Sequence, residues 1–467
     1  MQAKDHEYGL GARDESERSL RHSRRARLRA VLRTLQTGWS IVGVSLVLLL
    51  GIELAASLLG RRLMINAGRK EIRRYAKLAG AADSAWPEET LKATFARKMR
   101  WSPYVYWRSE PYSSTNVNVD QNGLRRTVQA RVTGGQSSHE IRIFAMGGST
   151  MWGSGARDSW TIPSILSRLL AEQGMRARIT NYGQDGYVST QEVIALLLEL
   201  QRRNIPDLVI FYDGVNDVNA MFQNAKAGVT LNEIARRTEF RAQTDATLFT
   251  SLPSALMHSA IARLFAPDPL ALAQRERSPD AWDRYTQELR QRGDFRAEYE
   301  RRKADQGGSL TPAQKQLLVE QMVARWAARE AVRAYDANVA AVDALSREFG
   351  FDVLFYWQPV IFEKSALSNA ESQLPTMHER FVQFFRINYG MIHRAIEGSS
   401  PEADDLPHVH RSVRYLGDLF SAPRWQTKTA FRDFCHLLEQ GNEAVVQAML
   451  SDVVQRIDDP RPPSRND

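Results

Sequence analysis

An uninterrupted apolar segment near the N-terminus places the strongest constraint on how this chain can fold. Residues Gly38 to Leu59 read GWSIVGVSLVLLLGIELAASLL, 22 residues with one ionisable group, Glu53. A helix of this length crosses the hydrocarbon core of a bilayer. A cleaved signal peptide or a buried helix of a soluble domain is the alternative. The preceding leader of about 37 residues is much longer than a usual signal-peptide n-region, so we expect an uncleaved membrane helix over 38–60.

The net charge of +8 is concentrated beside this segment. Residues 1–80 hold 16 of the 62 Lys and Arg but only 7 of the 54 Asp and Glu, so the rest of the chain is nearly neutral. A protein that binds nucleic acid usually carries a basic stripe on its folded domain. The sequence shows none beyond residue 80, which argues against nucleic acid as a partner.

The orientation of the membrane helix is not fixed by its flanking charges. Seven basic residues lie between Arg18 and Arg33, and seven more lie between Arg61 and Lys77. The positive-inside rule therefore favours neither orientation, and long domains translocate largely regardless of charge. We expect a basic cytoplasmic tail over 1–37 and a periplasmic or extracellular C-terminal domain. Cys435 is the only cysteine, so no intrachain disulfide forms.

The pattern after residue 140 alternates between strands and helices. Apolar runs predict strands at 141–146, 178–182, 208–212 and 353–357, and amphipathic runs predict helices at 163–173, 191–203 and 316–349. Such alternation is typical of a parallel sheet covered by helices on both faces, a three-layer α/β/α sandwich. The interval between the third and fourth strands is too long for one crossover and predicts a helical insertion over about 220–330.

Composition and periodicity together predict how the chain is divided into domains. We expect a membrane-proximal linker and small extended module over 61–135, with a basic amphipathic extension near the membrane surface at 61–80. The α/β domain follows over 136–455, and a disordered tail over 456–467 ends in the proline-containing stretch DDPRPPSRND.

The first strand of the α/β domain ends in Gly147-Gly148-Ser149-Thr150. A phosphate-binding loop would carry a lysine after Gly153, where this chain has Ser154. A nucleophile elbow of the Gly-x-Ser-x-Gly type would need glycine at Met151. Neither motif is complete, so a serine exposed at the carboxyl end of a strand and a simple turn both remain open.

Three further motifs follow at positions that bear on Ser149. Gly183 and Gly186 lie after the second strand, and Gly214-Val215-Asn216-Asp217 follows the third. The carboxyl ends of parallel strands share one edge of the sheet, where α/β proteins place their sites. Near the C-terminus, Asp433 and His436 have the spacing of a carboxylate and an imidazole on one turn. A serine needs such a base, and the base needs an acceptor that fixes its tautomer.

These four blocks, in this order, resemble the SGNH/GDSL hydrolase family. The resemblance covers about residues 140–215 and 335–450, with the predicted insertion between them. It implies that Ser149 is the nucleophile, His436 the general base and Asp433 the residue that orients the histidine. It also implies an oxyanion hole made by the backbone N–H groups of Ser149 and Gly186 and the side-chain amide of Asn216.

The sequence departs from the family pattern at one position and leaves some roles open. The usual Gly-Asp-Ser is Gly147-Gly148-Ser149 here, a form that looks more like bacterial envelope members of the family. Gly183 is the alternative oxyanion glycine. Asp433 also has the position of an N-cap for a helix from Leu437. A thiol mechanism through Cys435 is less favoured, because residues adjacent in sequence point apart.

We therefore expect a membrane-anchored SGNH-type serine esterase or acyltransferase that acts on ester-linked acyl groups. Its substrate would be an acylated envelope glycan or lipid, most plausibly an O-acetyl ester, with no cofactor and no metal. The alternative is a catalytically silent SGNH-fold subunit that binds glycans or acts as a scaffold. The sequence does not identify protein partners.

Overall fold

The computed structural model describes residues 5–80, 85–132, 140–233, 236, 279–398 and 413–459. The described residues from Arg69 onward belong to one compact unit that contains the sheet, whereas those before Arg69 belong to another. The small module at 85–132 is therefore part of the same unit as the α/β domain.

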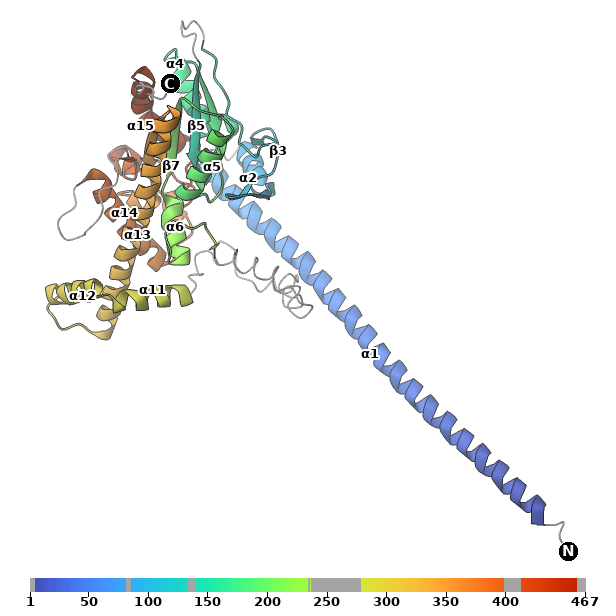
Figure 1. Ribbon diagram of the computed structural model, residues 1–467. Coiled ribbons are helices and arrows are strands. Elements are labelled where there is room, and N and C mark those ends of the chain that lie inside the picture. The colour runs from blue at the N-terminus through green and yellow to red at the C-terminus, as the bar shows by residue number, and fades with distance from the viewer. Residues whose placement is uncertain are drawn as a thin grey trace. The chain divides into compact units, whose positions relative to one another are not determined.

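A five-stranded parallel sheet forms the centre of the larger unit (Figure 1). Its strands lie in the order β6-β5-β7-β8-β9, and each pairs in parallel with its neighbours. The strands are β5 (Ile141–Gly147), β6 (Ala177–Asn181), β7 (Leu208–Asp213), β8 (Asp352–Trp357) and β9 (Val413–Tyr415). The four strands predicted from apolar runs are confirmed to within one residue at each end. The sequence analysis missed β9, whose three residues are too few to show a period.

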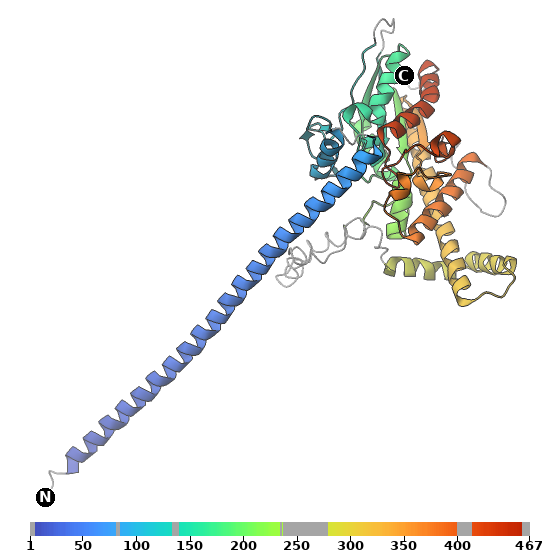
Figure 2. The ribbon, with the colours of Figure 1, turned by 180° about the vertical axis from the view of Figure 1, so that it is seen from behind.

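Helices cover both faces of the sheet, which confirms the predicted three-layer sandwich (Figures 1 and 2). Alternate residues of β5 point to opposite sides: Ile143 belongs to one buried hydrophobic cluster and Phe144 to the other. The first cluster includes residues of α4 (Ile162–Glu172) and α15 (Glu439–Asp458). The second includes residues of α5 (Ser189–Gln201), α6 (Val215–Asn224), α13 (Pro312–Phe349) and α14 (Glu379–Glu397).

The predicted helical insertion is present between α6 and the body of α13. Its described helices are α11 (Pro279–Gln291) and α12 (Gly293–Asp305). Trp282 anchors α11, because its indole N–H donates to Phe222 O at 2.8 Å and its ring packs edge-on against Phe384. Residues 237–278 lie outside the described part of the chain, as does the predicted tail from residue 460.

A small module precedes the sheet and packs against the turn after β6. It consists of α2 (Trp86–Ala96), an antiparallel hairpin of β1 (Met99–Ser102) and β2 (Tyr106–Ser109), and a second hairpin of β3 (Tyr112–Ser113) and β4 (Asn118–Val119). The Trp107 indole donates to Asp185 O at 2.8 Å, and the Gln184 side chain accepts from Ser109 N at 3.0 Å. This module therefore holds the 183–187 turn from outside the sheet.

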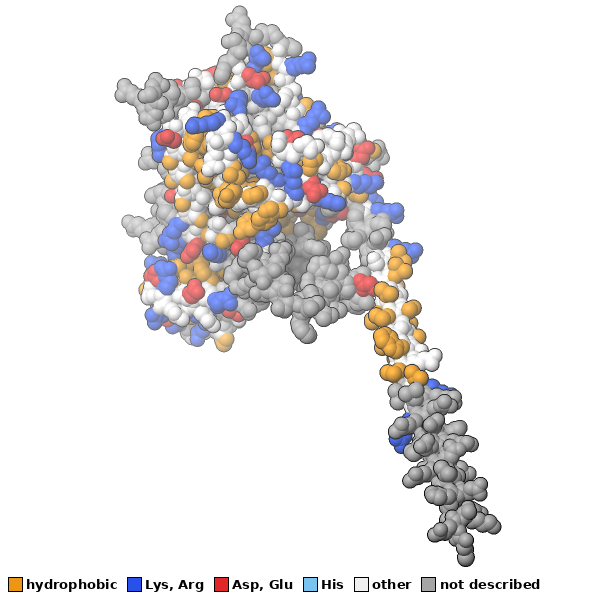
Figure 3. All heavy atoms as spheres, turned by 45° about the vertical axis from the view of Figure 1, so that its right-hand side comes forward, with side chains coloured by type: hydrophobic (Ala, Val, Ile, Leu, Met, Phe, Trp, Pro, Cys, Tyr) orange, Lys and Arg blue, Asp and Glu red, His pale blue; other side chains and the backbone are white. Residues whose placement is uncertain are grey.

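The helix α1 (Asp5–Leu78) contains the predicted membrane segment. Among the described residues, its part from Leu32 to Leu59 is the one stretch of helix long and apolar enough to cross a membrane, although a signal sequence would meet the same criterion. Figure 3 shows hydrophobic side chains covering this stretch. The last turns pack on the larger unit, where Tyr75 and Leu78 are buried with Leu91 and Leu438.

Short helices complete the described structure. One turn of helix, α3 (Ser149–Trp152), follows β5 directly. Five 3-10 turns lie at Asp158–Trp160, Ile361–Glu363, Glu371–Gln373, Leu419–Ser421 and Pro423–Trp425.

Three carboxyl groups are buried together behind the carboxyl edge of β7. Burial raises the pKa of Glu192 and Asp213 well above the ordinary range, and it raises the pKa of Asp217 to about 6 against the opposing hydrogen bonds from Ser189. Glu192 and Asp213 lie within hydrogen-bonding reach of each other, and the Tyr335 hydroxyl beside Asp213 opposes part of the rise in the pKa of that carboxyl. A shared proton satisfies both carboxyls, so the folded chain retains protons that an unfolded chain would release.

We predict that this cluster makes the protein less stable as pH rises. Between about pH 4 and 7 the folded state binds more protons than the unfolded state, so the free energy of unfolding falls across that window. Glu192→Gln should flatten this dependence and should raise stability at pH 7 by about 1 kcal/mol or more, because the amide cannot ionise. Denaturation of the full chain in detergent at several pH values measures this. The exposed Glu172→Gln is the control, and a pH-independent effect of Glu192→Gln would contradict the prediction.

Candidate active site

Close packing of two glycines at the end of β5 sets the position of Ser149. A Cβ added to Gly147 would lie 2.6 Å from Tyr212 O, and one added to Gly148 would lie 2.3 Å from Asn216 Nδ2. Ser149 then begins α3 and keeps 9% of its surface exposed. In this chain the Asn216 amide thus occupies the space that a side chain at 148 would need.

The structure brings Ser149, His436 and Asp433 into one hydrogen-bonded line. His436 Nε2 lies 2.8 Å from Ser149 Oγ, and His436 Nδ1 lies 2.8 Å from Asp433 Oδ2. The serine and histidine are 287 positions apart in the sequence. With Nδ1 protonated and donating to the carboxylate, Nε2 is the ring nitrogen that accepts the serine proton.

Local hydrogen bonds shape the Asp433–His436 turn. Asp433 Oδ1 accepts from the backbone N–H groups of Cys435 at 3.0 Å and His436 at 2.8 Å. The helix cap that we considered for Asp433 is wrong, because α15 begins only at Glu439, after an N-cap at Leu438. The aspartate instead closes an Asx turn that folds the histidine back toward its own carboxylate.

The surrounding charges keep the Asp433 carboxyl ionised. Burial among protein atoms raises its pKa, although about a quarter of the side-chain surface stays exposed, at 26%. The hydrogen bond and charge of His436, together with the Arg432 guanidinium, outweigh burial and hold the pKa well below its usual range. The group therefore serves as an anionic acceptor for the imidazole at neutral pH.

Arg432 links this carboxylate to the end of α1. Its Nε lies 3.3 Å from Asp433 Oδ2, and its guanidinium carbon lies 5.8 Å from the centre of the Tyr75 ring. The Tyr75 hydroxyl donates to Gly155 O, in the loop that follows α3. Sequence reasoning missed both residues. The adjacency of Arg432 to Asp433 was a usable signal, whereas nothing in the sequence pointed to Tyr75.

Asn216 lies against Gly148, next to the serine, and Gly186 lies in the loop after β6, beside Leu231 and Trp107. Asn216 Nδ2 donates to Tyr187 O at 2.7 Å while lying against Gly148. Gly186 has φ +71°, a left-handed conformation that glycine adopts without steric cost. Gly183, the alternative glycine, already donates its N–H to Asn181 Oδ1 at 2.9 Å. This bond favours Gly186 over Gly183 as a free backbone donor.

Cys435 lies beside the histidine but is poorly suited to be a nucleophile. Burial raises the pKa of its thiol well above the ordinary range, and the nearby Asp433 carboxylate raises it further. Its Sγ lies 3.6 Å from His436 Nδ1, the nitrogen that Asp433 engages. The possible ligand atoms of Asp433, Cys435 and His436 lie within 4.8 Å of one another, a separation at which they could bind one metal ion. However, both imidazole nitrogens face protein atoms here, so this arrangement does not present a free ligand set.

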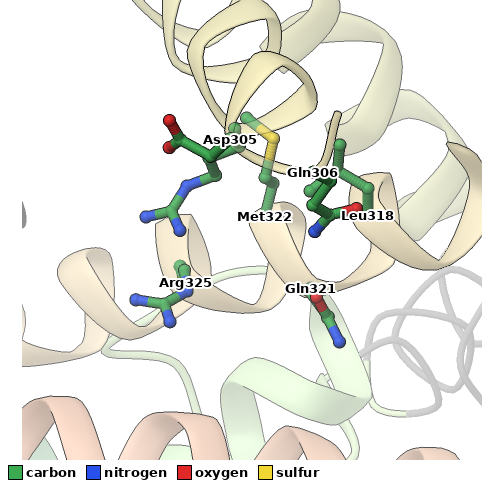
Figure 4. Close-up of a pocket in the computed structure, with 7 residues that line it drawn as sticks. Asp305, Gln306, Leu318, Gln321, Met322 and Arg325 are labelled. Carbon is green, nitrogen blue, oxygen red and sulfur yellow. The ribbon is translucent and has the colours of Figure 1, made fainter. Parts of the chain in front are cut away.

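Two hollows lie in other parts of the described structure. A cavity of about 130 Å³ between α12 and α13 is lined by Arg302, Asp305, Gln306, Leu318, Gln321, Met322 and Arg325 (Figure 4). A larger one of about 440 Å³ lies between the β3–β4 hairpin, the segment 124–129 and β6. Neither is lined by Ser149, Asp433 or His436.

Comparisons with known proteins agree with this geometry at the level of the family. Residues 145–300 match the model of the GDSL-like lipase/acylhydrolase family. No curated protein sequence matches the chain.

Several solved structures are similar to the chain at low sequence identity. An acetyl xylan esterase, AlAXEase, is 15% identical, with 67% of this chain and 100% of that chain covered and a TM-score of 0.32. A putative arylesterase from Agrobacterium tumefaciens is 14% identical over 68% and 99% of the two chains, with a TM-score of 0.32. A family 3 carbohydrate esterase from Clostridium thermocellum is 10% identical over 68% and 99%, with a TM-score of 0.29.

The matched residues begin within β5 and include Ser149, Gly186 and Asn216, three of the four blocks on which the resemblance was based. The α/β domain is therefore similar to the GDSL-like lipase/acylhydrolase family over residues 145–300.

Proposed function

We propose that this protein is a membrane-anchored serine esterase or acyltransferase that works through an acyl-Ser149 intermediate. The observation that carries the proposal is the continuous line of hydrogen bonds from Ser149 Oγ through His436 to Asp433, with both contacts at 2.8 Å. A serine hydroxyl is a weak nucleophile until a base takes its proton, and this line supplies that base together with its orienting anion. A silent binding or scaffold subunit would not need this alignment.

In the proposed reaction, His436 accepts the Ser149 proton as Oγ attacks the acyl carbonyl. The developing oxyanion is held by the backbone N–H groups of Ser149 and Gly186 and by the Asn216 amide. His436 then returns the proton to the departing alkoxide, which leaves as an alcohol. Water or a second hydroxyl group, activated by the same histidine, attacks the acyl-serine and releases the enzyme. Hydrolysis and transfer differ only in that final acceptor.

The proposed substrate is an acylated envelope glycan or lipid, with an O-acetyl ester as the favoured case. The support is the Gly-Gly-Ser-Thr form of the nucleophile block together with an apolar N-terminal helix long enough to span a membrane. We place the α/β domain on the periplasmic or extracellular side, with the basic tail 1–37 in the cytoplasm. In this account 61–135 is the membrane-proximal module, and 136–455 is the hydrolase-like domain.

We predict that the full chain in detergent hydrolyses small aryl acetates and that Ser149→Ala abolishes this turnover. Addition of an unacetylated oligosaccharide tests the final acceptor: an acyltransferase will produce acetylated sugar, whereas an esterase will release only acetate. Mass spectrometry of the products separates these two results. Full turnover by Ser149→Ala would refute the mechanism. A folded wild-type protein that hydrolyses none of the aryl acetates would favour a catalytically silent binding or scaffold subunit.

We predict that Asn216→Ala lowers kcat by about a hundredfold, roughly 3 kcal/mol, with little change in KM, because the amide stabilises charge that develops only in the transition state. Asn224→Ala is the matched control on the same helix, since that amide donates to Ala220 O at 2.9 Å. The control should lower the melting temperature while activity per folded molecule persists. If both variants lose only stability, Asn216 is not an oxyanion donor.

A further inference from the structure

The described apolar residues that reach solvent outside α1 are concentrated on one hairpin. Seven large hydrophobic side chains are exposed outside α1 among the described residues, and three of them, Met99, Trp101 and Tyr104, lie within six consecutive residues of the β1–β2 hairpin. Trp101 is 70% exposed and Tyr104 is 75% exposed. They are also the only aromatic residues among the seven. Exposed apolar side chains that are grouped on one surface often mark a site that binds another molecule.

The hairpin is held firmly, so this exposure is a property of the fold. Val105, directly after Tyr104, is fully buried, and its carbonyl accepts from Gln191 Nε2 at 2.8 Å. Trp107 is buried on the 183–187 turn, where its carbonyl accepts from the Tyr187 hydroxyl at 2.5 Å. Strand β2 is therefore held against the fold, and its partner β1, which pairs with it from Met99–Ser109 to Ser102–Tyr106, forms the exposed edge of the hairpin.

The backbone at the tip is strained in a way that few residues tolerate. Tyr104 has φ +66° and Tyr106 has φ +69°, both in the left-handed region that favours glycine. Strain of this kind persists where the surroundings impose it, and it is found disproportionately at functional surfaces. Here it keeps Tyr104 outside the fold, while Trp101 packs edge-on against Tyr106 with ring centres 5.6 Å apart.

The charge on the hairpin is of one sign. Residues 98–109 read KMRWSPYVYWRS and contain Lys98, Arg100 and Arg108 but no carboxylate. Lys98 and Arg100 are exposed beside Trp101. Trp and Tyr combine an apolar ring with a polar hydrogen-bonding group, which suits them to the boundary between acyl chains and headgroups. Adjacent cations add attraction to a surface of anionic lipids.

We propose that Met99, Trp101 and Tyr104 dock onto the surface of an anionic bilayer. The apolar segment in α1 ends at Leu59, 40 residues before Met99, so a chain anchored through that segment keeps the hairpin within reach of its own membrane. Tethering raises the effective concentration of the surface, so a weak interfacial contact is sufficient. The positive charge of Lys98 and Arg100 favours an anionic surface over an uncharged sugar as the occupant.

This contact would have a consequence for the candidate active site. The hairpin holds the 183–187 turn through Trp107 and Tyr187, and that turn contains Gly186. Docking would therefore fix how this side of the site faces the membrane. The consequence rests on the proposed function, whereas the docking itself does not, because it can be measured without any ester substrate.

The test uses the full chain in nanodiscs, with a spin label attached at Trp101→Cys. The native Cys435 is buried, and the unsubstituted protein controls for labelling there. In nanodiscs of equal parts phosphatidylcholine and phosphatidylglycerol, we expect the label to become several-fold less accessible to a water-soluble nickel chelate than in detergent, and more accessible to oxygen. The matched control is Leu197→Cys on α5, an exposed apolar position outside the hairpin, which should show no such change.

Two further measurements make the result decisive. Lys98→Gln with Arg100→Gln should reduce the protection at position 101, and nanodiscs of phosphatidylcholine alone should do the same, because both remove the electrostatic attraction. Equal accessibility of the labels at 101 and 197 in every bilayer would overturn the proposal. Protection that appears only when a soluble acetylated oligosaccharide is added would also overturn it, in favour of a sugar-binding surface. Ester turnover in the same samples separates failure of docking from failure of the proposed function.

Discussion

The close approach of β5 to its neighbours is the constraint on which the candidate site depends. Gly147 and Gly148 have no side chains, so β5 can end against Tyr212 and the Asn216 amide. Ser149 then starts a helix at the carboxyl edge of the sheet, where the loops that follow β6 and β7 also begin. A larger residue at 148 would displace either Asn216 or the serine, because its Cβ would lie 2.3 Å from the amide nitrogen. The position of the nucleophile and that of its proposed oxyanion donor are thus set by a single contact.

A second set of buried contacts positions His436 at that edge. Lys364 and Glu371 form an ion pair with no exposed side-chain surface, and Glu371 also accepts from the backbone N–H groups of Ala430 and Phe431. A buried ion pair is favourable only when its remaining hydrogen-bonding capacity is used, as it is here. These bonds fix the chain just before Arg432, after which Asp433 closes its own turn. On the other side, Arg432 packs on Tyr75 at the end of α1.

Much of this arrangement could be predicted from the sequence, for reasons that differ between its parts. The strands were predictable because β5, β7 and β8 are buried on both faces and read as nearly continuous apolar runs. Ser149, Asn216, Asp433 and His436 were found because each lies in a short motif at a strand end or a turn. The strand β9 and the contact between Tyr75 and Arg432 were not predictable, since they depend on long-range packing and leave no local period. The cap assigned to Asp433 failed because its spacing suits a turn as well as a helix start.

The most direct test of the central claim is to trap the acyl group on the protein. The full chain is mixed with an activated acetate ester, quenched in acid within the first turnover, digested and examined by mass spectrometry. The account predicts one added acetyl group on the peptide that contains Ser149, present in the wild-type protein and absent from Ser149→Ala. An acetyl group on Cys435, or unchanged labelling in Ser149→Ala, would contradict it.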